Sequence, residues 1–170
     1  MHNVEYWINH LELLPHPEGG YYKETYRSSE MISLPALPAR FEGERHYSTA
    51  IYFLLRSEDR SVFHRIKSDE VWHFYQGSTL LIYVLQQNGL QILKLGSDLE
   101  NGESLQVVIP ANCWFGALVE KPESFALCGC TVAPGFDFND FEMAQREDLL
   151  DAYPKEREII QRLTHPSTTH

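Results

Sequence analysis

The amino-acid sequence predicts a mainly β protein, a sandwich or barrel with short helices at its two ends. Two observations support this prediction. Short runs rich in β-branched and aromatic residues alternate with turn residues from Tyr21 to about Val132, as in all-β sandwiches and barrels. Apolar residues with helical spacing occur only before and after this region. The 170 residues are enough for one domain with a substantial core.

A short helix is expected at the N-terminus. Apolar residues keep a helical spacing there, behind a cap at Asn3: Val4, Trp7, Ile8, Leu11 and Leu14. Pro15 and Pro17 are expected to end this helix, because the residue before a proline is disfavoured in helical conformation.

The strand-like runs define the β region. They are Tyr21–Arg27, Tyr47–Leu55, Val62–Ile66, Glu70–Tyr75, Thr79–Leu85, Leu90–Leu95, Gln106–Ile109, Trp114–Val119 and Phe125–Val132. Asn88-Gly89, between the fifth and sixth runs, predicts a type I′ hairpin turn.

Two regions depart from the strand pattern. Ser28 to Arg45 is a long irregular insertion, of the kind that often supplies a lid. Beyond residue 135 the pattern is helical, from Met143 to Ala152 and again from Pro154. The sequence therefore predicts a single domain over residues 1–170, with a barrel over about 19–134 and a helical tail over 140–165.

Composition and charge exclude several kinds of partner. The net charge of −10 would repel a nucleic-acid backbone or an anionic membrane. No apolar run approaches the roughly 18–20 residues of a membrane span, and the N-terminus lacks the pattern of a signal peptide. Three cysteines, an odd number, argue against a disulfide framework. We therefore expect a cytoplasmic protein with no nucleic-acid or membrane partner and no cofactor.

Two motifs in the β region resemble those of cupins, which are small double-sheet jelly-roll barrels. The first cupin motif reads His-x-His, three or four residues, Glu, six residues, Gly, and this chain matches it at His64, Glu70 and Gly77. Ile66 stands where the second His would be, and Phe115 stands at the His of the second motif, Pro-x-Gly-x-x-His. Two of four metal ligands are thus apolar. One His and one carboxylate are too few for a tight metal site, so no metal is expected.

A closer resemblance extends over nearly the whole chain. Four blocks are similar to a family of cupins known as domain of unknown function 985, or cupin-5: Leu14 to Tyr22, His64 to Phe74, Pro110 to Trp114, and Val132 to Phe138. This resemblance implies an RmlC-like jelly roll, or double-stranded β-helix, which forms a homodimer and encloses a cavity of ligand size.

A more distant resemblance is to the dTDP-4-dehydrorhamnose 3,5-epimerases. Gly20, Tyr21, Tyr22 and Glu24 match the opening strand that clamps the nucleotide in those enzymes, and their catalytic His aligns with His64. Ser61 and Ile66 replace the Arg and Gln that accompany it. The resemblance implies a carbohydrate or nucleotide-linked ligand.

Strand alternation predicts which side chains meet inside the barrel. Glu70 and Trp72 share one face of their strand, and His64 and Ile66 share one face of the preceding strand. Together with Phe115 they would form a pocket with one imidazole, one carboxylate and an apolar wall. We expect Glu70 to orient His64 and raise its pKa, which would make His64 a general base. The alternative is a buried pair that only satisfies its own hydrogen bonds.

The opening strand offers further ligand contacts. Tyr22, Glu24 and Tyr26 alternate onto one face, where they could stack a base or sugar and accept its protons. The alternative is that the tyrosines pack a dimer interface, where Tyr is common.

Two functions follow from these residues. The first is an epimerase- or isomerase-like enzyme in which His64 is the base and Glu70 its partner. The second is a non-catalytic cupin that holds a metabolite between Trp72, Phe115 and the opening strand, along Tyr22 and Glu24. A metal-dependent cupin enzyme ranks third.

Overall fold

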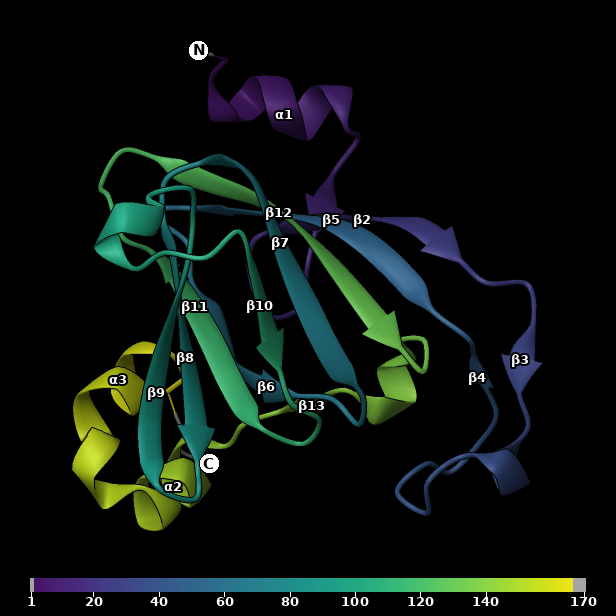
Figure 1. Cartoon of the computed structure of the whole chain (residues 1–170). Coiled ribbons are helices and arrows are strands. Elements are labelled where there is room, and N and C mark those ends of the chain that lie inside the picture. The colour runs from purple at the N-terminus through teal and green to yellow at the C-terminus, as the bar shows by residue number, and fades with distance from the viewer. Residues whose placement is uncertain (1, 167–170) are drawn as a thin grey trace.

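The protein folds as two antiparallel sheets that face each other, as the computed structural model of residues 2–166 shows (Figure 1). The first sheet has the order β1 (Leu14–Pro15), β2 (Tyr21–Arg27), β5 (Thr49–Arg56), β12 (Phe125–Ala133), β7 (Asp69–Gly77) and β10 (Gln106–Ile109). The second has the order β13 (Glu142–Met143), β6 (Ser61–Arg65), β11 (Trp114–Val119), β8 (Leu80–Gln86) and β9 (Gly89–Leu95). The mainly β architecture predicted from the sequence is confirmed. Residue 1 and residues 167–170, which belong to the predicted domain, lie outside the described residues.

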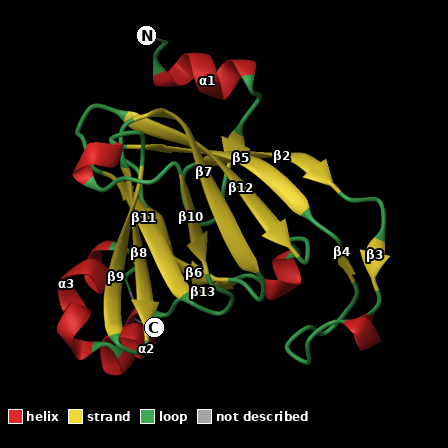
Figure 2. Ribbon diagram, viewed as in Figure 1, coloured by secondary structure: helices red, strands yellow, loops and turns green. Residues whose placement is uncertain are grey.

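Three clusters of buried apolar residues lie between the layers of the structure. The largest fills the space between the sheets and includes Phe53, Trp72, Ile82 and Phe115. A second lies on the outer side of the second sheet, under α2 (Arg146–Ala152) and α3 (Arg157–Arg162). A third lies under α1 (Val4–His10), on the outer side of the first sheet. Both terminal helical regions therefore cover outer faces and leave the space between the sheets to the strands (Figure 2).

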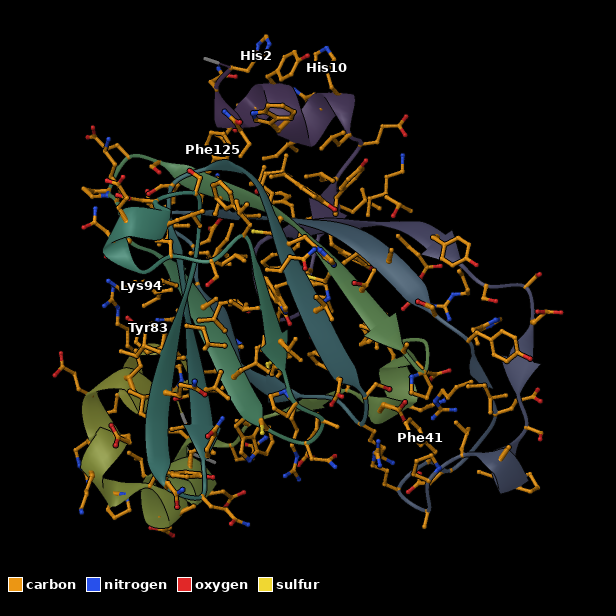
Figure 3. The ribbon with its side chains drawn as sticks, in the orientation of Figure 1. His2, His10, Phe41, Tyr83, Lys94 and Phe125 are labelled. Atoms are coloured by element: carbon orange, nitrogen blue, oxygen red, sulfur yellow. The ribbon has the colours of Figure 1, made fainter. Side chains whose placement is uncertain are left out.

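The N-terminal helix is shorter than its apolar pattern predicts. Asn3 caps it as expected, by accepting a hydrogen bond from the backbone N–H of Tyr6. The helix ends at His10, and Glu12 has a left-handed φ of 54°. Leu13 leaves the helix and is buried in the third cluster, so packing ends the helix before the prolines do. Figure 3 shows His2 and His10 on the side of α1 that faces away from the sheet.

Two other boundaries differ from the predictions. The hairpin between β8 and β9 exists, but its turn is at Gln87-Asn88, with Gln86 opposite Gly89. Gly89, at φ 113°, joins β9 directly, whereas the predicted type I′ turn would centre on Asn88-Gly89. Met143, expected in a helix, belongs to β13 because it pairs with His64 of β6.

The insertion after β2 is partly ordered by its own short elements. It contains β3 (Met31–Ile32), the 3₁₀ helix η1 (Leu34–Ala36) and β4 (Arg45–His46), and β3 and β4 form a separate two-stranded sheet. Two further 3₁₀ helices, η2 (Leu99–Asn101) and η3 (Phe138–Asp140), lie in loops, and η4 (Pro154–Glu156) leads into α3. No helix in the described part of the chain has the length and apolar character that a membrane crossing requires.

Candidate functional site

A cavity of about 420 Å³ lies inside the barrel, against the inner face of the first sheet. Its wall is mainly apolar and aromatic, with a small set of charged side chains. The lining residues are Glu12, Leu14, His16, Glu18, Tyr22, Lys23, Glu24, Arg27, Thr49, Ile51, Phe53, His64, Ile66, Glu70, Trp72, Cys130, Val132, Phe136, Phe138 and Phe141. The volume and the character of the wall are those of a small-molecule site.

His64 is held by Glu18, not by the predicted partner Glu70. The carboxylate of Glu18 lies 2.6 Å from Nε2 of His64, and both side chains are buried. The other ring nitrogen, Nδ1, lies 2.7 Å from the backbone carbonyl of Val62, to which it must donate. Both nitrogens of His64 are therefore engaged by the protein. The expectation that Glu70 orients the ring is wrong, because Glu18 occupies the position at Nε2.

The pair of Glu18 and His64 is charged. Burial alone would lower the pKa of His64, but the carboxylate of Glu18 outweighs burial and raises it. Burial alone would raise the pKa of Glu18, but the charge and the hydrogen bond of His64 lower it. The proton therefore resides on the imidazole, and Glu18 remains a carboxylate that accepts its hydrogen bond.

Glu70 is a second buried carboxyl, in a different electrostatic situation. It lies on β7 with 8% of its surface exposed, and burial followed by the negative charge of Glu18 raises its pKa to about 7. Within the described residues it takes part in no ion pair. Glu70 can therefore gain or lose a proton near neutral pH, as a group that exchanges protons with a ligand must.

Two neighbours of Glu70, Cys130 and Trp72, carry hydrogen-bond donors. The thiol of Cys130 stays protonated, because burial and the carboxyl of Glu70 raise its pKa well above the ordinary value. The indole N–H of Trp72 lies close enough to Glu70 to lower the pKa of its carboxyl group. Its position does not satisfy the geometry of a hydrogen bond. Trp72 Nε1 is one of the buried side-chain donors without a partner in the described residues. The wall around Glu70 thus contains an unsatisfied donor.

The imidazole of His16 adds a neutral ring to the wall. Its Nδ1 accepts a hydrogen bond from the backbone N–H of Glu18 at 3.1 Å, which places the proton of the neutral ring on Nε2. Burial lowers the pKa of His16 more than the charge of Glu18 raises it. The ring packs edge-on against Tyr22, with centroids 4.6 Å apart.

Residues 136–141, which we name the cover segment, close one side of the cavity with three phenylalanines. Phe141 stacks on His64 with ring centroids 5.4 Å apart. Arg27 of β2 donates to the backbone carbonyl of Phe136 at 3.0 Å. Arg45 of β4 forms a buried bidentate pair with Asp140, at 2.6 and 2.8 Å. Two arginines therefore anchor the cover segment.

The residues at the cupin motif positions do not fit a metal ion. Ile66 and Phe115 carry no ligand atom, and the Nε2 of His64 is occupied by Glu18. No group of three His, Cys, Asp or Glu side chains is arranged as metal ligands in residues 2–166. We derive no metal-dependent step for this site.

The structure brings most of the predicted site residues together. His64, Glu70, Tyr22, Glu24, Ile66 and Trp72 all line the cavity. Phe115 does not, because it is fully buried behind His64, with ring centroids 4.2 Å apart. His73 faces away and bonds to Thr131, as strand alternation predicts.

Tyr26 does not share the face of Tyr22 and Glu24. The register of β2 on β5 shifts between Glu24 and Tyr26, so Tyr26 turns outward and is 55% exposed. The same shift turns Arg27 inward, where it lines the cavity and pairs with Glu24 at 2.7 Å. A β-bulge, which strand alternation cannot anticipate, thus changes which residues line the cavity.

Glu18 is the functional residue that sequence reasoning missed. It lies in the turn before β2, next to Gly19 and Gly20, which both have positive φ. The only signal was its place in the block from Leu14 to Tyr22, between a histidine and two glycines. A loop position gives no strand parity, so nothing in the pattern directs its side chain into the barrel.

Comparisons with known proteins agree with this fold. A protein of Shewanella oneidensis has a crystal structure with a TM-score of 0.86 and 40% identity, covering 98% of this chain and 100% of that chain. A hypothetical protein from Leishmania major gives a TM-score of 0.88 and 32% identity, over 97% of this chain and 100% of that chain. Oxalate decarboxylase from Bacillus subtilis, at 14% identity and a TM-score of 0.53 over 88% of this chain and 36% of that chain, is similar in fold alone.

Sequence comparisons place the chain in a family. An uncharacterised protein of Saccharomyces cerevisiae is 30% identical over 157 residues, which cover 87% of this chain and 78% of the yeast protein. The sequence model of the family described as Cupin superfamily (DUF985) matches residues 5–144, which include every element that lines the cavity. The chain therefore belongs to the DUF985 family of the cupin superfamily.

Proposed function

We propose that the protein binds a small organic molecule in the cavity. The observation that carries this proposal is Glu70, a buried carboxyl in a mainly apolar cavity of about 420 Å³, with no ion-pair partner within the described residues. An ionisable group in such a place costs stability unless something pairs with it. The cavity wall offers Glu70 no positively charged partner within the described residues, and a bound ligand would supply one.

The other predicted residues have proposed roles in the wall. Tyr22 and Glu24 of β2 contribute one ring and one carboxylate, while Ile66 and Trp72 contribute apolar surface. Phe115 supports the ring of His64 from behind. In this arrangement Tyr22, Ile66 and Trp72 contact the ligand, and Phe115 acts only through His64.

Thermal unfolding of the metal-stripped protein against a panel of small molecules tests this proposal. The panel contains sugars, sugar acids, nucleotides, nucleotide-sugars, amines and divalent metals. A ligand that binds only the folded state adds about 2.7 kcal/mol at a hundredfold excess over its dissociation constant, which raises the midpoint measurably. A shift that is lost when Ile51→Trp fills the cavity would support binding at this site.

The matched control is Val108→Trp, which introduces the same side chain at an exposed position of β10 outside the cavity wall. Shifts that survive Ile51→Trp, or that vanish equally in Val108→Trp, would place the ligand elsewhere. A variant that unfolds is replaced by Val132→Phe, which enlarges a different wall residue on β12.

A second function, epimerase- or isomerase-like proton transfer, is favoured by the pKa of Glu70 near 7. With both nitrogens of His64 engaged, the group that faces the ligand is Glu70, and the Glu18–His64 pair acts on it by charge. Glu70 would take a proton from a carbon next to a carbonyl of the substrate and return it to the opposite face or to a neighbouring carbon. A carbohydrate or nucleotide-linked substrate would meet Tyr22 and Glu24.

Hydrogen–deuterium exchange at carbon distinguishes the two functions. In deuterated water, a substrate that turns over would lose its C–H signal in the NMR spectrum with the unmodified protein and keep it with Glu70→Gln. Binding without exchange, for a ligand found in the thermal panel, would favour the non-catalytic cupin. The homodimer and the cytoplasmic location implied above stay predictions, which light scattering and cell fractionation would test.

A further inference from the structure

The charges that line the cavity form pairs, with one carboxyl left over. Lys23 pairs with Glu12, Arg27 pairs with Glu24 at 2.7 Å, and His64 pairs with Glu18 at 2.6 Å. These are all the cationic residues among the lining residues, each of which lies in the described part of the chain. Of the four lining carboxyls, only Glu70 has no ion-pair partner among the described residues. The lining set therefore carries a net charge of zero when Glu70 is protonated and −1 when it is ionised.

Aromatic rings form much of the remaining wall. They are His16, Tyr22, Phe53, Trp72, Phe136, Phe138 and Phe141. Phe53 and Trp72 lie edge to face at 5.2 Å, beside Glu70 on the first sheet. Phe136, Phe138 and Phe141 contact one another in the cover segment, with centroids 4.9 to 6.4 Å apart. Aromatic faces attract cations through the ring quadrupole, most strongly where water is excluded.

We propose that the ligand is an organic monocation, an ammonium ion whose charge meets Glu70 and whose carbon substituents pack on the aromatic wall. This inference rests on the proposed function, that the cavity is a ligand site, and it adds the charge of the ligand. A carboxylate or phosphate of a ligand would find no unpaired cation in the wall, because Lys23, Arg27 and His64 already have carboxylate partners. Binding an anion there would require breaking one of these pairs.

Isothermal titration calorimetry with matched probes tests the charge of the ligand directly. Choline is compared with its uncharged carbon isostere, 3,3-dimethyl-1-butanol, and benzylammonium is compared with benzyl alcohol, all at pH 8. Each pair has nearly the same shape and differs in charge. We expect each cation to bind about tenfold or more tightly than its neutral counterpart, because a buried carboxylate and aromatic faces both favour the charge.

Glu70→Gln keeps the shape of the side chain and removes its charge. In this variant we expect the cation preference to fall about tenfold or more, while the affinity for the neutral probes is unchanged. Glu100→Gln, an exposed glutamate of η2 outside the cavity, is the matched control and should keep the preference. Phe138→Leu changes a half-exposed residue of the cover segment and keeps an apolar side chain. It should lower the affinity for the cations more than the affinity for the neutral probes.

Three outcomes of the comparison between cations and neutral probes would overturn the inference. They are equal affinity within each pair, a preference for the neutral probes, and a cation preference that survives Glu70→Gln. Absence of cation binding at millimolar concentration would also overturn it. A sugar or other neutral molecule that binds in the thermal panel and is excluded by Ile51→Trp would leave the proposed function standing, so the two failures are distinguishable.

Discussion

Nε2 of His64 donates a hydrogen bond to the carboxylate of Glu18 at 2.6 Å, at the position where the cupin motif that this chain resembles has a metal ligand. The other nitrogen is bonded to the carbonyl of Val62. This relationship determines what the site can do. The imidazole is committed to a buried ion pair, and the group that remains for a ligand is Glu70.

Glu18→Gln should destabilise the protein by about 3–5 kcal/mol, because it leaves the His64 cation buried without its partner. Urea denaturation at pH 7 measures this loss. The raised pKa of His64 should fall in the same variant, which an NMR titration of the ring would show. Glu58→Gln, which removes an exposed partner of Arg56, should cost less than about 1 kcal/mol. A loss of less than about 1 kcal/mol for Glu18→Gln would contradict the presence of a buried ion pair.

The stabilisation that the Glu18–His64 pair contributes should decrease at high pH and also at low pH. The pKa of His64 is raised, so its contribution is complete below the ordinary value of 6.5 and is lost as pH rises through the raised pKa. The pKa of Glu18 is lowered, so its contribution is complete above 4.5 and is lost as pH falls through the lowered pKa. The difference in unfolding free energy between the unmodified protein and Glu18→Gln should therefore peak between about pH 4.5 and 6.5. If this difference in unfolding free energy does not vary with pH, it does not arise from the charges of Glu18 and His64.

Glu70 should have the opposite effect on stability. Its pKa rises from 4.5 to about 7 in the folded protein, so the fold disfavours the ionised form. Stability should fall as pH rises from 4.5 to about 7 and stay level above, by about 3 kcal/mol in total at ~1.4 kcal/mol per pH unit. Glu70→Gln should therefore be more stable than the unmodified protein at pH 8, with little difference at pH 4.5. Denaturation measurements at pH 4.5 and pH 8, with Glu100→Gln as the control, would show whether Glu70→Gln gains stability only at the higher pH.

Gly19→Ala should destabilise the protein by about 3 kcal/mol or more, because strain and overpacking add. Gly19 has a φ of 110°, and a Cβ there would lie 2.0 Å from the backbone oxygen of Arg60. Gly102→Ala is the matched control, since its φ is also positive, at 79°, but nothing lies within 4 Å of the added Cβ. It should cost only about 1 kcal/mol. If thermal unfolding shows equal losses of stability for Gly19→Ala and Gly102→Ala, the backbone at Arg60 must move away from the added Cβ at little cost.

Asp140→Asn should cost about 3 kcal/mol, because it breaks the buried bidentate pair with Arg45 that anchors the cover segment. Glu142→Gln, two residues further along, breaks an exposed pair with Arg65 and should cost less than about 1 kcal/mol. Ligand affinity measured by calorimetry should fall for Asp140→Asn and not for Glu142→Gln. Unchanged affinity in a folded Asp140→Asn protein would show that the anchor does not shape the cavity.

The strands were predictable because each run carries its own pattern. The bounds predicted for Tyr21–Arg27, Gln106–Ile109 and Trp114–Val119 coincide with β2, β10 and β11. Regular alternation placed Glu70 and Trp72 in the cavity and His73 outside it, because β7 keeps its two faces along these residues. Local pattern thus determines the strands and much of the inner surface.

What the sequence did not reveal depends on contacts between distant segments. Glu18 lies in a loop, and only the folded barrel brings it to His64. The bulge that turns Tyr26 outward is set by the pairing of β2 with β5, and the partner of Asp140 is Arg45, which lies 95 residues away in the sequence. Such features have no periodic signal in the residues around them.

The anchoring of the His64 ring also determines the order in which the site can be built. Glu18 reaches the ring from a segment synthesised before the barrel strands, and Phe141 stacks on it from a segment synthesised after the last long strand, β12. Since domains fold as the chain is translated, the strands can begin to pair while the ring still lacks its final neighbour. The aromatic wall of the cavity is complete only once Phe141 has packed on His64, so any molecule that needs this wall could bind only after that step.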